Sequence, residues 1–296
     1  MPTRTPKVLL ENIMFPEGPR WHKDRLWFSD MYAHEVVAVD MQGKREVICR
    51  VEQQPSGLGW LPDGRALIVS MLDRRLLRLE KPGMLARLMG RNGSVKLTQV
   101  ADLKAITGGE CNDMVVDSKG RAYVGNLGFD VHGGAPDKPG NIVMVTPDGK
   151  TRIVADNLMI PNGTVVTPDG KTMIVGESRG KRLTAFDIQP DGSLTNRRVW
   201  AQLEVVPDGI CLDAEGCIWV GAPSQNTAYY RVAQGGKIKE KIESDGWMAI
   251  ACMLGGPSGK TLFMLDVKTG QKSAIKDRTN GRIRTVEVDV PRAGLP

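Results

Sequence analysis

The sequence predicts an all-β fold, a six-bladed β-propeller whose N-terminal strand closes the last blade. Three observations favour this fold: one strand–turn–strand pattern occurs six times, 34 glycines and 18 prolines punctuate the chain, and long runs of helix formers are missing. Repeated units of this kind are typical of arrays in which each unit is one supersecondary motif. Residues 1–296 are expected to form a single domain, because all-β domains of about 250 residues are common.

Each repeat has a small or polar residue, an apolar stretch, a tight turn and then an alternating strand. Turns such as Asp63-Gly64 and Asp169-Gly170 supply a residue that tolerates positive φ, and Asp24-Arg25 is the expected turn of the first repeat. Strands such as Ile218-Trp219-Val220 are β-branched or aromatic, as strands prefer. The six segments are 16–30, 55–71, 111–127, 161–177, 207–223 and 251–266.

A third strand is expected after every hairpin, and a fourth, more polar strand after most of them. The third strands are predicted at 36–40, 76–79, 142–146, 183–188, 229–233 and 283–289. Fourth strands are predicted at 45–51, 96–101, 151–156 and 237–242, among others. The unit is therefore a four-stranded meander. Dividing 296 residues by six gives about 49 residues per unit, close to the blade length of propeller repeats.

The ring of blades also has to close. Stacking six meanders around an axis buries their faces and leaves only short edges. The last repeat ends near Val290 without a fourth strand, whereas Lys7–Phe15 is a spare strand ahead of the first hairpin. The N-terminal strand is therefore expected to complete the last blade. A parallel β-helix is the alternative fold, but its repeats would be shorter and more uniform.

Composition narrows the functional classes. The net charge is +6, but the basic residues are scattered and form no stripe interleaved with aromatics, so nucleic-acid binding is not expected. Five cysteines without CxxC spacing favour free thiols in a reducing compartment. The N-terminus has no apolar signal region and no stretch approaches 18 apolar residues. We expect a cytoplasmic protein without a membrane partner, either a monomer or a homodimer.

The first strand of each hairpin should line the central channel, so one column of the repeats becomes a ring around the axis. Four of its six residues carry hard oxygen donors. Each of these residues could instead be an ordinary turn residue that caps the start of a strand. That explanation accounts for any one of them better than for all four in the same column. Crowded carboxylates need a cation, and oxygen donors suit Ca²⁺ first, with Zn²⁺, Mn²⁺, Mg²⁺ or Fe²⁺ also open. The ring consists of Glu17, Ser56, Asn112, Asn162, Asp208 and Ala251.

At this column the sequence resembles the SMP-30/gluconolactonase/luciferin-regenerating-enzyme family over nearly its whole length. The resemblance is carried by Glu17-Gly18-Pro19-x-Trp21, Asn112-Asp113, Pro161-Asn162-Gly163 and Pro207-Asp208-Gly209. It implies a six-bladed propeller with one metal ion and, in many members, lactone hydrolysis. It also implies that Glu17, Asn162 and Asp208 are direct ligands, and that Asn112 contacts substrate and can approach the metal. A related propeller that hydrolyses phosphotriesters carries the same four-residue pattern around calcium.

One departure from the family affects the substrate. Sugar-lactone hydrolases of this kind often have Arg two residues before the Asn-Asp pair, where this chain has Glu110, whereas a second acidic position is retained as Asp130. An anion at the mouth argues against a charged or strongly polyhydroxylated substrate. The insertion Gly128–Gly140 contains Phe129 and His132, each of which is either a substrate contact or an ordinary loop residue.

The expected activity is metal-dependent hydrolysis of a small lactone or ester. The ion would stabilise the oxyanion and activate water, and Asp208 is the first candidate for the base, with Glu110 or Asp130 as alternatives. Only three histidines are present, so a multi-histidine zinc centre is poorly supported. Two other functions stay open: a metal-dependent phosphotriesterase-like hydrolase, and a non-catalytic calcium-binding or protein-interaction propeller.

Overall fold

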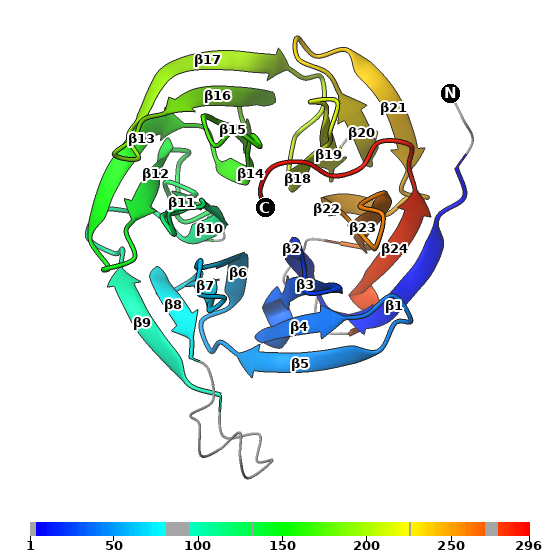
Figure 1. Cartoon of the computed structure of the whole chain (residues 1–296), viewed down its shortest axis with the longest axis horizontal. Coiled ribbons are helices and arrows are strands. Elements are labelled where there is room, and N and C mark those ends of the chain that lie inside the picture. The colour runs from blue at the N-terminus through cyan, green and yellow to red at the C-terminus, as the bar shows by residue number, and fades with distance from the viewer. Residues whose placement is uncertain (1–3, 81–94, 132, 225, 270–277) are drawn as a thin grey trace.

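The computed structural model describes residues 4–80, 95–131, 133–224, 226–269 and 278–296. Six four-stranded sheets surround a common axis, and every pairing within them is antiparallel (Figure 1). The predicted six-bladed propeller is therefore confirmed, and the parallel β-helix is wrong. Alternating strands with two-residue periodicity bury both faces between neighbouring blades, which a single meander could not do.

The first three blades follow one another in sequence, each from the axis outwards. Blade 1 comprises β2 (Pro16–His22), β3 (Arg25–Asp30), β4 (Glu35–Val39) and β5 (Arg45–Arg50). Blade 2 comprises β6 (Pro55–Trp60), β7 (Ala66–Ser70), β8 (Arg75–Leu79) and β9 (Leu97–Asp102). Blade 3 comprises β10 (Cys111–Val116), β11 (Ala122–Asn126), β12 (Gly140–Val145) and β13 (Thr151–Leu158).

The other blades continue the ring, and the last one is shared by the two ends of the chain. Blade 4 comprises β14 (Pro161–Val166), β15 (Thr172–Glu177), β16 (Arg182–Ile188) and β17 (Leu194–Gln202). Blade 5 comprises β18 (Ile210–Leu212), β19 (Ile218–Ala222), β20 (Ala228–Val232) and β21 (Ile238–Glu243). Blade 6 comprises β22 (Met248–Gly255), β23 (Thr261–Val267), β24 (Gly281–Glu287) and β1 (Lys7–Ile13).

The N-terminal strand closes the ring as predicted. Strand β1 pairs antiparallel with β24, from Lys7 opposite Thr285 to Ile13 opposite Gly281. Figure 1 shows this blue strand beside the red β24. Because the outermost strand and the three inner strands of blade 6 come from opposite ends of the chain, the blade cannot form before both ends meet.

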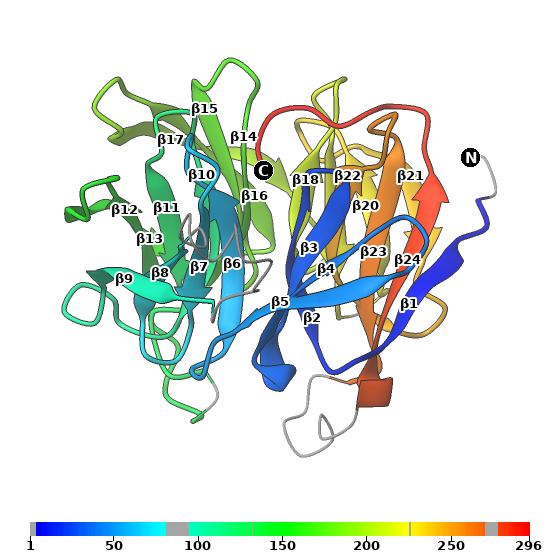
Figure 2. The same ribbon diagram turned by 60° about the horizontal axis from the view of Figure 1, so that its bottom comes forward.

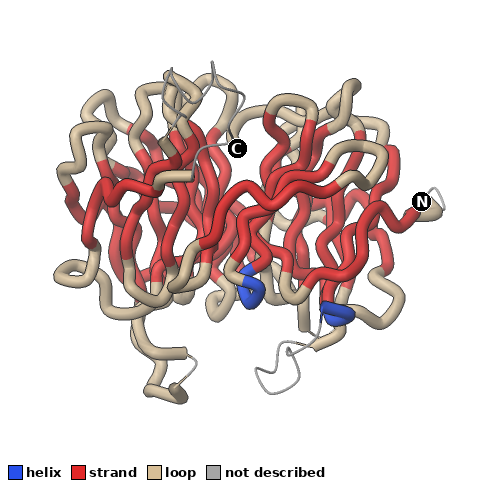
Figure 3. The backbone as a smooth tube through the Cα atoms, turned by 90° about the horizontal axis from the view of Figure 1, so that it is seen from below, coloured by secondary structure: helices blue, strands red, loops and turns tan. Residues whose placement is uncertain are grey.

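The ring has two different faces, seen obliquely in Figure 2 and edge-on in Figure 3. We call the face at which the inner strands begin the proximal face and the opposite one the distal face. The short 3₁₀ helices η1 (Met31–Ala33) and η2 (Arg278–Asn280) lie at the proximal face. At the distal face lie the hairpin turns and the C-terminal segment. That segment bonds to two inner strands: Ala293 N donates to Leu212 O at 3.0 Å, and Leu295 N donates to Val166 O at 2.9 Å.

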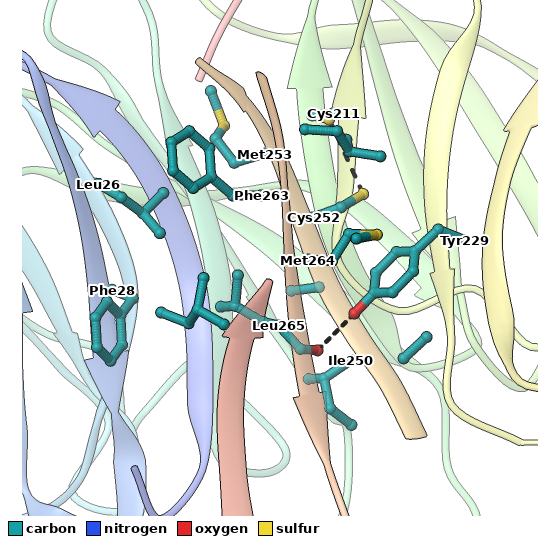
Figure 4. Packing of buried hydrophobic residues seen from close by; sticks show 14 of the residues in the cluster. Leu26, Phe28, Cys211, Tyr229, Ile250, Cys252, Met253, Phe263, Met264 and Leu265 are labelled. Atoms are coloured by element: carbon teal, nitrogen blue, oxygen red, sulfur yellow. Dashed lines mark hydrogen bonds between the residues drawn. The ribbon is translucent and has the colours of Figure 1, made fainter. Parts of the chain in front are cut away.

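The core lies between blades and is largest around blade 6. Large side chains such as Phe28, Tyr229 and Phe263 are fully buried there (Figure 4), each contributing about 1.5–3 kcal/mol of transfer free energy. All five cysteines are reduced and buried, as the sequence indicated. Cys211 and Cys252 of adjacent inner strands meet with their sulfurs 3.9 Å apart.

Most predicted strand boundaries agree with the structure within two residues, and the first hairpin is the clearest local correction. His22 pairs with Arg25, so the turn is Lys23-Asp24 rather than Asp24-Arg25. Both turn residues have positive φ, 48° and 58°, which aspartate tolerates and which lets the two strands pair without a glycine. Among the described residues, no helix is long and apolar enough to cross a bilayer.

Candidate metal centre

The ring residues lie where the inner strands begin, at the proximal end of the axis. Five of the six inner strands have a register irregularity at this level, for example between Glu17 and Arg20 in β2 and between Cys111 and Met114 in β10. In blade 5 the regular strand starts only after Asp208. Such bulges re-aim side chains, and here they free the ring residues from the alternation of the strand.

Glycines after the ring residues let neighbouring inner strands approach closely. A Cβ atom on Gly57 would lie 2.5 Å from Met114 N, and one on Gly163 would lie 2.5 Å from Ile210 N. Real Cβ atoms do not come so near to backbone, so a larger residue would push the blades apart. The glycines therefore narrow the axis to a width at which ring side chains from different blades interact.

Glu17 and Asp208 form the electrostatic centre of the ring. Burial and the charges of Asp208 and Asp113 raise the pKa of Glu17 well above its usual value. Burial raises the pKa of Asp208 to about 7, a hydrogen bond with Asn162 opposes the rise, and Asp113 adds to it. Neither ring carboxylate forms an ion pair among the described residues, and both remain partly accessible to water.

The two amide side chains complete the oxygen-rich part of the ring. Asn162 bonds to the Asp208 carboxylate and its Nδ2 donates to Ser178 Oγ at 3.4 Å, while Ser178 Oγ donates to Pro207 O at 2.7 Å. On the other side, Ser56 Oγ donates to Asn112 Oδ1 at 3.2 Å. The structure therefore brings together Glu17, Asn162 and Asp208, with Asn112 in the neighbouring blade of the same ring.

A buried ion pair lies beside this ring and was not predicted. Arg20 Nη2 donates to Asp113 Oδ1 at 2.6 Å, and the two residues are only 3% and 8% exposed. The same guanidinium donates to the carbonyl oxygens of Pro19, Leu58 and Met114. Asp113 belongs to the Asn-Asp pair of the sequence, but its partner lies 93 residues away in blade 1, so only the packing of the blades reveals the pair.

An apolar collar surrounds part of the proximal mouth. We use this name for one cluster to which loops of blades 1 to 4 contribute: Met31, Met71 and Leu127 with the partly buried Phe15, Tyr32, Val131 and Ile160. The collar therefore joins loops of four successive blades on the proximal face. Glu110 lies beside the collar, because its charge, after burial, contributes to the raised pKa of Tyr32.

The remaining predicted substrate residues make local contacts or lie outside the described chain. Phe129 is only 5% exposed, and its backbone packs on Gly109. Asp130 is exposed, and its Oδ1 accepts a hydrogen bond from Gly133 N at 2.6 Å, within its own turn. His132 lies outside the described residues. Substrate binding by Asn112, Glu110, Phe129, Asp130 and His132 stays a prediction.

The described cavities lie away from the ring carboxylates. One of about 710 Å³ lies on the distal face between blades 3 and 4, and one of about 150 Å³ lies beside Arg20, His22 and Trp60. His22 stacks on Trp60 with 4.0 Å between ring centroids, and burial followed by the charges of Lys23 and Arg292 lowers its pKa to about 4. This histidine is therefore a neutral packing residue.

The donor set fits a hard divalent cation. Asp208 Oδ1 is buried and accepts no hydrogen bond from the described residues, which is costly for a carboxylate unless a cation contacts it. Carboxylate and amide oxygens are the ligands that calcium and magnesium prefer. Within the described ranges no three His, Cys, Asp or Glu side chains gather at one point, so such a centre would combine two carboxylates with amides.

The fold and the ring together define a propeller with a polar, acidic centre on its axis. The family model described as the SMP-30/gluconolactonase/LRE-like region matches residues 15–267, and the chain belongs to this family. Regucalcin from Oryctolagus cuniculus is 24% identical over 278 residues, covering 89% of this chain and 86% of that protein. Regucalcin from Danio rerio is 25% identical over 178 residues, and the match spans only 60% of that relative.

Solved structures agree with the fold. A luciferin-regenerating enzyme superposes with a TM-score of 0.82 at 20% identity, covering 99% of both chains. Regucalcin from Agrobacterium tumefaciens, described as a calcium-binding protein, superposes with a TM-score of 0.78 at 21% identity, covering 99% of this chain and 97% of that one. At these identities the likeness supports the propeller and leaves the chemistry to be argued from the site.

Proposed function

We propose that this protein is a metal-dependent hydrolase that opens a small lactone. The observation that carries the proposal is the pair of carboxylates, Glu17 and Asp208, with raised pKa values and no ion-pair partner among the described residues. A partly buried acidic pair of this kind is expected where a cation or a proton has a functional role. Membership of a family whose description includes gluconolactonase makes ester hydrolysis the first reaction to test.

Each residue has a proposed task. Glu17, Asn162 and Asp208 would hold one divalent ion, Ca²⁺ first among the candidates, through their side-chain oxygens. When bound, such an ion polarises an ester carbonyl and makes water more acidic. Asp208 would take the proton from the attacking water, because its Oδ1 accepts no hydrogen bond from the described residues. Asn112 would orient the substrate, since its amide lies in the same ring.

The collar supports an uncharged substrate with an apolar or aromatic group. Phe15, Tyr32, Val131 and Ile160 are only partly buried, so they offer apolar surface close to the ring. Covering that surface would contribute about 25 cal/mol per Å². Glu110 adds negative charge beside the collar and would repel an anionic substrate. Dihydrocoumarin, an aromatic lactone, is therefore expected to react faster than a sugar lactone.

A metal titration combined with a hydrolysis assay tests the proposal. The chelated protein is supplied with calcium, manganese, zinc or magnesium, and turnover of dihydrocoumarin, a sugar lactone and paraoxon is compared. Activity on lactones that depends on metal and is lost in Asn162→Ala supports the proposal. Preferred turnover of paraoxon would favour a phosphotriesterase. Metal binding that Asn162→Ala abolishes without any measurable hydrolysis in the parent protein would favour a non-catalytic calcium-binding propeller.

A further inference from the structure

The axial charges can be counted from the residues that the structure brings together. Glu17 and Asp208 contribute −1 each, Asp113 contributes −1, and Arg20 contributes +1, which sums to −2 when all are ionised. Asp113 acts electrostatically on both ring carboxylates, and Arg20 acts on Glu17 in the opposite sense. The charge at the axis therefore depends on the Arg20–Asp113 pair as well as on the ring.

We infer that Arg20 is a positioning and charge-balancing residue that holds the axial site at the net charge one divalent cation neutralises. This inference rests on the proposed metal site. Arg20 neutralises Asp113, which otherwise would bring the site to −3, and its guanidinium also ties Asp113 to the backbone of blades 1 to 3. Asn112, the adjacent ring residue, directly precedes the anchored Asp113 in the chain.

The geometry favours this role over a purely structural one. A guanidinium with four hydrogen bonds, on a side chain only 4% exposed, has a fixed position, so its charge acts on the ring from a constant distance. A buried ion pair by itself adds little stability compared with apolar residues of the same shape. The charge of Arg20 is felt at Glu17, which gives the pair an effect on cation binding that an apolar pair would lack.

A double-mutant cycle tests the inference by measuring calcium affinity of the full chain with isothermal titration calorimetry. Asp113→Asn leaves the charge of Arg20 unbalanced, so the net charge of the site changes from −2 to −1. Calcium affinity should then drop on the order of 100-fold. Arg20→Gln changes the net charge of the site from −2 to −3. Calcium affinity should then increase on the order of tenfold at neutral pH. The combined variant returns to −2 and should bind within about threefold of the parent protein.

A second ion pair of similar burial provides the control. Arg121 Nε and Asp117 Oδ2 are 2.6 Å apart, and Asp117 lies four residues beyond Asp113 along the chain, about 13 Å for an extended strand. Asp117→Asn and Arg121→Gln should leave calcium affinity unchanged even where they lower the melting temperature. Arg20→Lys keeps the positive charge but lacks the planar guanidinium with its several donors. Its calcium affinity should be within about threefold of that of the parent protein.

Each result has a defined meaning. Higher affinity in Arg20→Gln, together with restored affinity in the double variant, supports charge balance, because a purely structural injury would lower affinity in both single variants. Equal effects of Asp113→Asn and Asp117→Asn, or a double variant weaker than both single variants, would overturn the inference and leave the proposed metal site intact. A parent protein that binds none of calcium, manganese, zinc or magnesium would overturn both.

Discussion

The axial carboxylates Glu17 and Asp208 and the blade carboxylate Glu177 differ in whether the chain itself supplies a balancing arginine. Glu177 on β15 is completely buried, yet it meets Arg182 at 2.9 Å and Arg197 at 3.2 Å and accepts a hydrogen bond from Met159 N. Burial would raise its pKa, but these contacts outweigh burial and lower it. Glu17 and Asp208 have no such arginine partner among the described residues, and their pKa values rise.

Under the proposed function, this difference separates the acids that stabilise a blade from those that hold the metal ion. An acid that only has to hold a blade together is balanced by the chain itself, because an unpaired buried charge is strongly destabilising. At the axis the chain pairs Asp113 with Arg20, whereas Glu17 and Asp208 have no ion-pair partner among the described residues. Natural proteins tolerate such local conflicts mainly at functional sites. The following variants test whether the two groups of acids really differ in this way.

The largest effect is expected from Asp208→Asn, which keeps the shape of the side chain and removes its charge. Loss of a ligand and of the base should lower kcat/KM on lactones about 1,000-fold, or ~4 kcal/mol of transition-state stabilisation. Steady-state kinetics at saturating calcium measure it. Asp213→Asn is the matched control, because Asp213 is paired with Arg231 at 2.6 Å: stability should fall and activity should persist. Equal loss of activity in both variants would contradict the assignment.

Most of the fold could be predicted from the sequence, because its signals are local. Turn pairs such as Asp63-Gly64 and the two-residue alternation of each strand define the repeats, and the spare segment Lys7–Phe15 predicts the closure that β1 and β24 make. The ring column follows from the repeat register alone. Its side chains can therefore be identified without knowledge of the packing.

The surroundings of the ring could not be predicted, because they depend on how the blades pack. Arg20 reaches Asp113 across 93 residues of sequence, and nothing in Pro19-Arg20-Trp21 indicates that partner. The collar joins loops of four blades, and its members are ordinary apolar residues in sequence. The bulges at the ring level depend on close approach at Gly57 and Gly163, whose spacing to neighbouring strands exists only in the folded ring.

A smaller effect, on stability alone, is expected from Glu177→Gln. Arg182 and Arg197 would lose their partner, and because both arginines are about one-third exposed, water would compensate part of the loss. We expect a decrease of about 2 kcal/mol in the free energy of unfolding, measured by denaturant titration, with calcium affinity unchanged. A changed calcium affinity would mean that acids of the two groups are not independent.

The pH dependence of stability should have opposite signs without and with calcium. The carboxyl of Asp208 titrates near pH 3.9 in the unfolded chain and near 7 in the metal-free fold. Between these values the folded state binds more protons, so metal-free stability should fall, by about 3 kcal/mol in total, as pH rises from 4 to 7. Thermal melts across this range measure it. Calcium binds the ionised form of the carboxylates. At saturating calcium the free energy of unfolding should therefore rise with pH.

The smallest expected effect is a gain. Glu17→Gln removes one of the two uncompensated axial charges, so the metal-free protein at pH 8 should become more stable by about 1 kcal/mol. The same variant should bind calcium far more weakly, since it loses a charged ligand, and calcium should therefore stabilise the parent protein more than the variant. In thermal melts, Glu17→Gln should be more stable than the parent protein without calcium and less stable than it with calcium. If Glu17→Gln destabilised the metal-free protein as Glu177→Gln does, Glu17 would belong with the structural acids, and the distinction between the two groups would not hold.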